Sequence, residues 1–262
     1  EPDQPKNMPL GFKHVSLGSG NSYENPIKYV QDILKLENQL HERFRDGGDI
    51  ESERYHLFYL CKSFNYTGYR LDNENIYKYF PYGKDHLKIF LERGIFYYDK
   101  FLSMFTDTGE EWYVRYLKAE LLERLGRLED SLKEYIISHE KRPDRGEALC
   151  RLFWHYYNNS QWDEAFDCGV KLKKLKCPIE NDSWQLELDA YYENSWRLRD
   201  AIAVAHERIG SKNKDISLLN ESKQIFEQLL HNYEDEKIPQ GDNKARLEGN
   251  IKFIEDTIKE IS

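Results

Sequence analysis

The 262-residue sequence predicts an all-α protein built as a right-handed helical-repeat solenoid. A motif recurs at a spacing close to 34 residues, and apolar residues follow the 3.6-residue helical period. No strand-rich segment interrupts these stretches. Hydrophobic residues make up 39% of the chain, which permits a packed core. The apolar runs are too short for a membrane span, so none is expected.

Three copies of the motif define the repeat. The first begins at Gly126, the second 34 residues later at Ser160, and the third at Trp196. This period is that of the tetratricopeptide (TPR) unit, in which two helices are joined by a tight turn. Such a unit needs a small residue where its two helices pack closely. The residues at that position are Ser131, Ala165 and Ala201.

Each unit is expected to contain a first and a second helix. Hydrophobic spacing and the prolines at 143 and 178, which cannot continue a helix, set their limits. The predicted first helices span 112–125, 147–158 and 183–194. The predicted second helices span 128–141, 162–175 and 198–209.

Further helices flank the three units. Upstream, a short strand is predicted at 12–17 and helices at 26–44 and 52–64, followed by a turn at 65–68 and an insertion at 69–84. A long helix at 85–105, bent at Gly94, leads to the repeats. Downstream, helices at 216–233 and 245–261 flank a loop at 237–244. These elements group into a linker at 1–25, a divergent expanded repeat with N-terminal helices at 26–111, three TPR-like units at 112–210 and capping helices at 211–262.

Charge and motif content disfavour several functions. The net charge of −9, with both signs interspersed, argues against nucleic-acid binding. The sequence has no Gly-x-x-x-x-Gly-Lys phosphate loop and no His-Glu-x-x-His metal motif. We therefore expect neither catalysis by this chain alone nor a cofactor in it. The four cysteines form no Cys-x-x-Cys pair, which predicts free thiols and a cytoplasmic location.

The first helices of a TPR array line a concave groove. The 34-residue frame places aromatic and polar side chains there from the first two units. The expected groove residues are Tyr113, Tyr116, Glu120, Glu123, Cys150, Trp154, Tyr157 and Asn158. Aromatic rings beside carboxylates and amides suit a peptide or a glycan. The alternative is that Trp154 and Tyr157 pack between adjacent helices.

Several motifs together resemble the C-terminal TPR-like region of family 2-type glycosyltransferases. The first motif is Gly11-Phe-Lys-His14-Val, and the second is Arg54-Tyr-His-Leu-Phe-Tyr-Leu60 in the predicted helix at 52–64. The third, Arg142-Pro-Asp-Arg-Gly-Glu-Ala148-Leu, differs from the family pattern in having Ala in place of Pro at 148. The fourth is the segment from Trp184 to Tyr192.

The resemblance implies a function for the chain as part of a larger enzyme. The family's nucleotide-sugar domain, with its Asp-x-Asp metal motif, would precede residue 1, and residues 1–25 would form its end. The parent enzyme would then use a nucleotide sugar and a divalent metal, with His14 as a weak candidate for the edge of that site. The present chain would bind or position a glycan or peptide acceptor without catalysing transfer. Alternatives are a freestanding adaptor that binds a protein partner, and an autonomous enzyme with a pocket of perturbed titratable groups.

Overall fold

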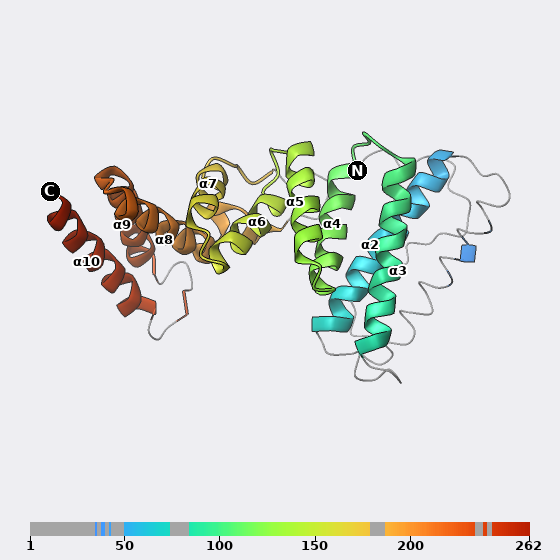
Figure 1. Ribbon diagram of the computed structural model, residues 1–262, viewed down its shortest axis with the longest axis horizontal. Helices are drawn as coiled ribbons and strands as arrows, with labels where there is room; N and C mark the ends of the chain where they lie inside the picture. The colour runs from blue at the N-terminus through green and yellow to red at the C-terminus, as the bar shows by residue number, and fades with distance from the viewer. Residues whose placement is uncertain are drawn as a thin grey trace. The chain divides into compact units, whose positions relative to one another are not determined.

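A computed structural model describes residues 50–73, 84–178, 187–233, 238–239 and 243–262. It also describes four isolated positions, all helical: Lys35, Asn38, Gln39 and Glu42. Within these residues every regular element is a helix, which confirms the all-α prediction (Figure 1). The chain divides into two units, Glu1–Lys141 and Arg142–Ser262. That division falls inside the segment 112–210 predicted to hold the three repeats.

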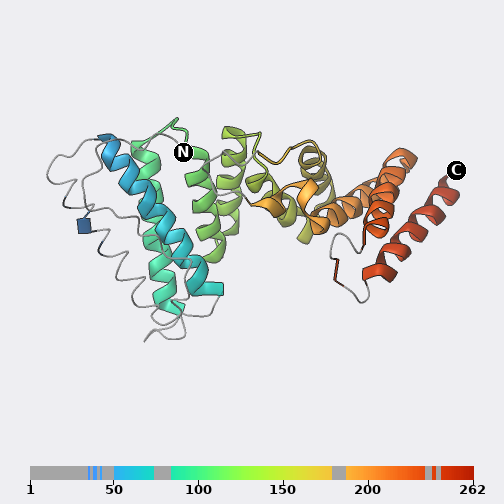
Figure 2. The same ribbon diagram turned by 180° about the vertical axis from the view of Figure 1, so that it is seen from behind.

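Unit 1 contains α2 (Ile50–Asn73), α3 (Lys84–Met104), α4 (Glu111–Arg124) and α5 (Leu128–Lys141). Each of these helices packs on the next, and α2 also packs on α4 (Figure 2). Helix α2 therefore packs against both α3 and α4. The predicted helices at 85–105, 112–125 and 128–141 agree with α3, α4 and α5 to within one residue at each end.

A close approach of α2, α3 and α4 explains two glycines in unit 1. A Cβ atom on Gly94 would lie 2.8 Å from Leu121 Cδ1 and 3.2 Å from Phe64 Cβ. A Cβ atom on Gly68 would lie 2.7 Å from Leu91 Cδ2. The predicted turn at 65–68 is wrong, because α2 continues through it and uses Gly68 as a packing surface. Likewise α3 continues as one helix through Gly94.

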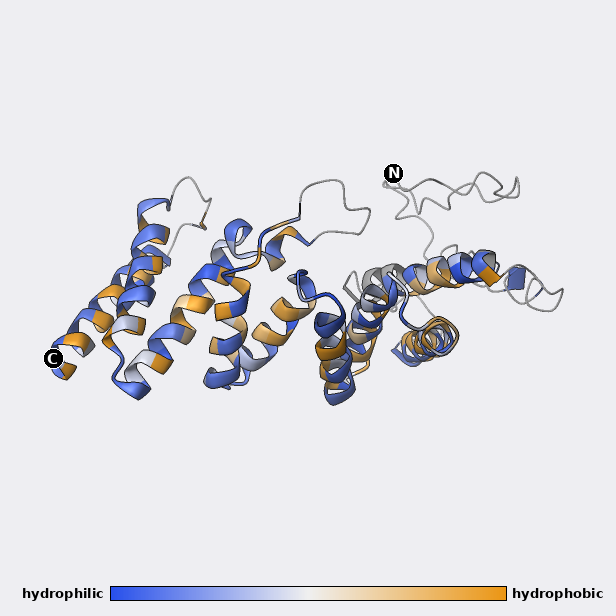
Figure 3. Ribbon diagram, turned by 90° about the horizontal axis from the view of Figure 1, so that it is seen from above, coloured by the Kyte–Doolittle hydropathy of each residue, from blue (hydrophilic) through white to orange (hydrophobic). Residues whose placement is uncertain are grey.

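Unit 2 contains α6 (Glu147–Asn158), α7 (Trp162–Leu172), α8 (Trp196–Asn213), α9 (Ile216–His231) and α10 (Asn243–Ile261). Here too each helix packs on the next. The helices of both units carry hydrophobic and hydrophilic residues side by side, as amphipathic packing requires (Figure 3). The expected helix at 162–175 ends earlier, at Leu172, and those at 147–158, 216–233 and 245–261 agree to within two residues.

Two turns that lie 34 residues apart in the sequence share the same backbone conformation. Gly126, between α4 and α5, has a φ of 75°, and the next amide donates to the Leu122 carbonyl at 2.9 Å. Ser160, between α6 and α7, has a φ of 56°, and the next amide donates to the Tyr156 carbonyl at 2.9 Å. Both turns are thus the same left-handed cap that ends a helix and reverses the chain.

The first helix expected for the third unit is wrong in its described part. Of the expected first helix at 183–194, the described part forms two short 3₁₀ helices, η2 (Leu188–Ala190) and η3 (Tyr192–Asn194). The left-handed cap recurs instead after α8, at Lys214, whose φ is 54°. Helix α8 contains the predicted second helix at 198–209, and it packs both on α7 and, across the Lys214 turn, on α9.

The start of α8 is defined by a side-chain cap. Ser195 has extended backbone, and its Oγ accepts the Leu198 amide at 3.3 Å. The predicted strand at 12–17, most of the helix at 26–44 and positions 74–83 of the insertion lie outside the described residues. Among the described helices, none has both the length and the hydropathy of a membrane span.

Replacing Gly94 by Ala tests the close packing of unit 1. The added methyl group collides with Leu121 and Phe64, so Gly94→Ala lowers the free energy of unfolding by about 1–2 kcal/mol. The matched control is Gly249→Ala in α10, where a Cβ atom would meet no described atom within 4 Å. The control raises stability by up to about 1 kcal/mol through helix propensity. Urea unfolding measures both, and a stabilising Gly94→Ala would contradict the packing.

Candidate functional site

The predicted groove draws its residues from both units. In unit 1 the rings of Tyr113 and Tyr116 are buried, with 3% and 2% of their surfaces exposed. The Phe58 ring of α2 lies 6.2 Å from the Tyr113 ring, and the Tyr135 ring of α5 lies 5.7 Å from the Tyr116 ring. Neighbouring helices therefore cover both tyrosines. This corrects the expectation that they present free aromatic faces to a ligand.

Both carboxylates of unit 1 that were expected in the groove, Glu120 and Glu123, accept hydrogen bonds from side chains of the same unit. Asn65 Nδ2 donates to Glu120 Oε2 at 3.0 Å, and the Tyr116 hydroxyl donates to Glu120 Oε1 at 3.4 Å. Tyr135 donates its hydroxyl proton to Glu123 Oε2 at 3.0 Å. Glu120 thus joins α4 to α2, and Glu123 joins α4 to α5. Both contribute to helix packing in unit 1.

In unit 2 the predicted aromatic residues form a partly exposed cluster. Trp154 and Tyr157 of α6 are half-buried, and so is Trp162 at the start of α7. The Tyr157 ring lies 5.6 Å from Trp154 and 5.4 Å from Trp162, both edge to face. Phe153 lies beneath, fully buried and 5.8 Å from Tyr157. We call the three half-buried rings, Trp154, Tyr157 and Trp162, the aromatic surface.

Polar and charged groups accompany the aromatic surface. Asn158 follows Tyr157 and is exposed. The Arg208 guanidinium of α8 lies 5.7 Å from the Trp162 ring, within the range of a cation–π contact. Burial raises the pKa of Tyr157, and the Asp200 carboxylate raises it further. The phenol therefore stays neutral and able to donate a hydrogen bond at neutral pH.

The sequence indicated only part of this cluster. Trp154, Tyr157 and Asn158 were expected in the groove, whereas Trp162 and Arg208 were not. The 34-residue frame could have indicated Trp162, because it is the second residue after Ser160, in the turn that follows α6. The position of Arg208 depends on how α8 packs against α7, which no local pattern encodes.

Cys150 of α6 was expected to point into the groove, but it is buried. Burial raises the pKa of its thiol to about 12, so the thiolate is scarcely populated at neutral pH. The Cys150 side chain therefore has the properties of a core residue. It offers neither a nucleophile nor a ligand contact.

Two motifs of the glycosyltransferase resemblance meet in a buried cluster in unit 2. Arg145 and Glu147 are each 2% exposed and form a two-pronged ion pair, with N–O distances of 2.6 and 3.1 Å. The Tyr191 hydroxyl donates to Glu147 Oε2 at 3.2 Å and accepts the Gly146 amide at 3.2 Å. We call Arg145, Glu147 and Tyr191 the buried clamp. It fastens the segment between η2 and η3 to the first residues of α6.

A third motif also has a structural role. Arg54 of α2 contacts Glu51 at 2.8 Å and Glu110, just before α4, at 3.5 Å. It therefore links α2 to the start of α4. His14, the weak metal candidate, lies outside the described residues. Within the described part of the chain, no group of three or more His, Cys, Asp or Glu side chains could hold a metal ion.

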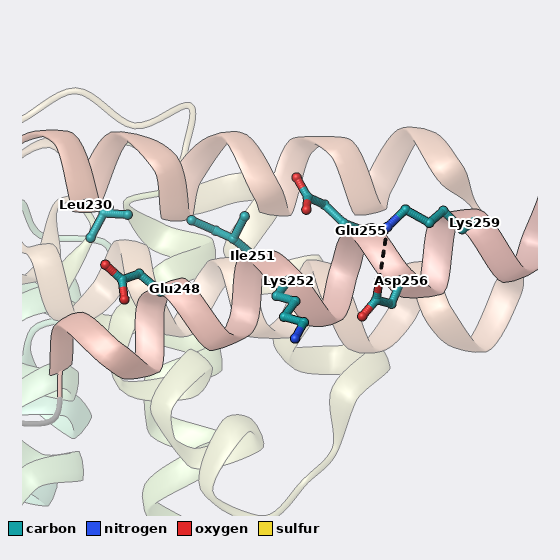
Figure 4. A pocket seen from close by; sticks show the side chains of 7 residues that line it. All are labelled: Leu230, Glu248, Ile251, Lys252, Glu255, Asp256 and Lys259. Carbon is teal, nitrogen blue, oxygen red and sulfur yellow. Dashed lines mark hydrogen bonds and ion pairs between the residues drawn. The ribbon is translucent and has the colours of Figure 1, made fainter.

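One open pocket lies between α9 and α10 and has a volume of about 450 Å³ (Figure 4). Leu230 and Ile251 supply its apolar lining, and the remaining lining residues are charged. Asp256 and Lys259 form an ion pair at 3.1 Å, and Glu255 pairs with Lys223 at 2.6 Å. These charges neutralise one another along the helices. The lining is that of a polar surface on the last hairpin.

Comparison with known protein families and with curated protein sequences finds no match. The glycosyltransferase resemblance therefore depends on the sequence motifs alone. Of those motifs, the described residues Arg54, Arg145 and Glu147 all act in packing.

Glu147→Gln tests the buried clamp. The change removes the carboxylate that accepts two hydrogen bonds from the buried Arg145, so the free energy of unfolding falls by about 3–5 kcal/mol. Asp130→Asn, which breaks the exposed pair with Arg127, serves as the control and leaves stability essentially unchanged. Urea unfolding followed by tryptophan fluorescence measures both. Equal, small effects would show that the clamp contributes little.

Proposed function

We propose that this chain is a TPR-like helical-repeat domain that binds a partner through the aromatic surface of unit 2. The observation that carries the proposal is the exposure of three packed rings, Trp154, Tyr157 and Trp162, on two consecutive helices. Core aromatic residues of the same unit, such as Phe153 and Tyr191, are fully buried. The aromatic surface is thus a part of unit 2 whose apolar area is available to a ligand.

The chemistry of the aromatic surface suits recognition. Trp, Tyr and Arg are the residues that most often dominate binding energy at protein interfaces. Their rings offer large area with little loss of conformational entropy, and the Tyr157 hydroxyl and the Asn158 amide can hydrogen-bond to a ligand. A peptide or a glycan chain would meet these requirements. We favour a ligand, either a glycan acceptor or a partner peptide, that the aromatic surface of unit 2 holds in position.

The remaining parts of the proposal follow from the sequence. The repeated turns at Gly126 and Ser160 support a right-handed TPR-like solenoid. The sequence motifs that resemble family 2-type glycosyltransferases support a link to an upstream catalytic domain, which would use a nucleotide sugar and a divalent metal. Four free cysteines support a cytoplasmic location. In this proposal the chain positions an acceptor, and catalysis belongs to the upstream domain. A freestanding adaptor would use the same surface for a protein partner.

Trp154→Ala tests the aromatic surface. Titration of the chain with a panel of oligosaccharides and short peptides, followed by nuclear magnetic resonance, first identifies a ligand that shifts the signals of Trp154, Tyr157 and Trp162. Trp154→Ala then weakens binding by about 2 kcal/mol, or roughly thirtyfold in Kd, because the contact area of the ring is lost. Far-UV circular dichroism remains at the wild-type value, because the ring is only half-buried.

The matched control is Phe96→Ala in α3 of unit 1. The Phe96 side chain is 59% exposed and is not part of the aromatic surface, so the control removes an exposed ring elsewhere in the chain. The control leaves Kd unchanged. Equal loss of helicity in Trp154→Ala would identify Trp154 as a core residue. Shifts with oligosaccharides favour the acceptor function, shifts with peptides alone favour the adaptor, and no shift at the aromatic surface would contradict both.

A further inference from the structure

Arg208 of α8 places a positive charge on the aromatic surface. Its guanidinium carbon lies 5.7 Å from the centroid of the Trp162 ring, and the Trp162 ring lies 5.4 Å from the Tyr157 ring. The Arg208 side chain is 53% exposed. The aromatic surface therefore combines two half-exposed rings with a positive charge that a ligand can reach from solvent.

Two ion pairs flank the aromatic surface. Asp200 of α8 accepts from Arg246 of α10 at 2.9 Å, and both groups are close enough to Tyr157 to change the pKa of its phenol. Asp163 of α7 accepts from Lys212 of α8 at 2.7 Å. The charges of these four side chains cancel in pairs, so they offer little net attraction to a charged ligand.

Arg208 differs from these paired groups because its guanidinium keeps unused hydrogen-bond donors. The Glu207 carboxylate lies 3.5 Å from its Nε atom and is only 9% exposed. Glu207 accepts a hydrogen bond from the Ser211 hydroxyl instead, at 3.1 Å. Within the described part of the chain, Arg208 makes no hydrogen bond to a protein acceptor. Its N–H groups are therefore free for a carboxylate, which a guanidinium binds in a two-pronged geometry.

We propose that the ligand of the aromatic surface is an acidic glycan, in which the carboxylate of a uronic acid binds Arg208 and the sugar ring packs on Tyr157 or Trp162. This inference rests on the binding function proposed above and names its ligand. A uronic acid carries its carboxylate on the same pyranose ring whose C–H face covers an aromatic ring. One sugar residue can thus contact both the rings and the guanidinium, whereas a peptide would need an acidic and an apolar residue at a matching spacing.

The polar groups beside the rings fit the rest of such a sugar. The exposed Asn158 amide can donate to and accept from sugar hydroxyls, and the neutral Tyr157 hydroxyl can do the same. These groups orient the sugar, and Arg208 selects for its charge.

Titration of the full chain, followed by nuclear magnetic resonance, tests the proposal with matched probes. The probes are trisaccharides of galacturonic or glucuronic acid and their methyl esters, which keep the sugar rings but carry no charge. We expect an acid to shift the indole signals of Trp154 and Trp162. We also expect it to bind about tenfold more tightly than its ester, because a hydrogen bond between charged groups is stronger than one to a neutral acceptor.

Variants of Arg208 identify the group that recognises the carboxylate. Arg208→Gln removes the charge, so acid and ester bind with equal Kd. Arg208→Lys keeps the charge but not the two-pronged donor set, so a reduced preference for the acid remains. The matched control is Arg127→Gln just before α5, which removes the same charge from a side chain that is 51% exposed and leaves the preference at its wild-type value. Circular dichroism confirms that all three variants fold.

Three results would overturn this inference. Equal binding of acid and ester by the wild-type chain would show a glycan surface that does not select for charge. A preference for the acid that survives Arg208→Gln would place the carboxylate elsewhere. Shifts at the aromatic surface with peptides but not with the uronic acid trisaccharides would identify a peptide ligand. The proposed binding function stands in all three cases, whereas no shift with any ligand would contradict it as well.

Discussion

The buried ion pair between Arg145 and Glu147 is the interaction on which unit 2 depends most. Two charges removed from water destabilise a fold unless every polar atom finds a partner. Here both oxygens of Glu147 accept from Arg145, and one also accepts the Tyr191 hydroxyl proton. The same hydroxyl accepts the Gly146 amide, one of the donors that a helix start leaves unpaired. The clamp thus fixes the irregular segment 188–194 against the start of α6, the helix that carries Trp154 and Tyr157.

Unit 1 depends on a different constraint, the close approach of helices around Leu121. Gly68 and Gly94 leave room for the Leu121 side chain between α2 and α3. Once α2 packs this closely on α4, it covers Tyr113 and also encloses Lys62. The same packing that buries Tyr113 therefore also places the Lys62 ammonium group 5.8 Å from the centroid of the Tyr113 ring. In unit 2 no equivalent helix covers the aromatic surface within the described residues, and its rings remain half-exposed.

The sequence predicted those features that depend on residues close together along the chain. Helix α5 and helix α6 were predicted at their observed bounds, because turn residues and apolar spacing mark both ends. The first helix of the third repeat was predicted incorrectly at 183–194, because the motif from Trp196 onward matches a second helix in its small and apolar positions and so implies a first helix before it. The Ser195 cap and the left-handed Lys214 determine instead where the hairpin begins and turns. Burial of Tyr113 and the hydrogen bond from Tyr191 to Glu147 depend on residues distant in sequence, so no periodicity could reveal them.

The Tyr191 hydroxyl and the Arg145–Glu147 pair together hold the start of α6 in place. Hydrogen exchange, resolved by residue in the wild-type chain and in Tyr191→Phe, tests it most directly. We predict that the Gly146 amide loses its acceptor and exchanges faster in the variant, whereas amides in the middle of α9 and α10 keep their wild-type rates. Unchanged exchange at Gly146, or equal acceleration throughout unit 2, would contradict it.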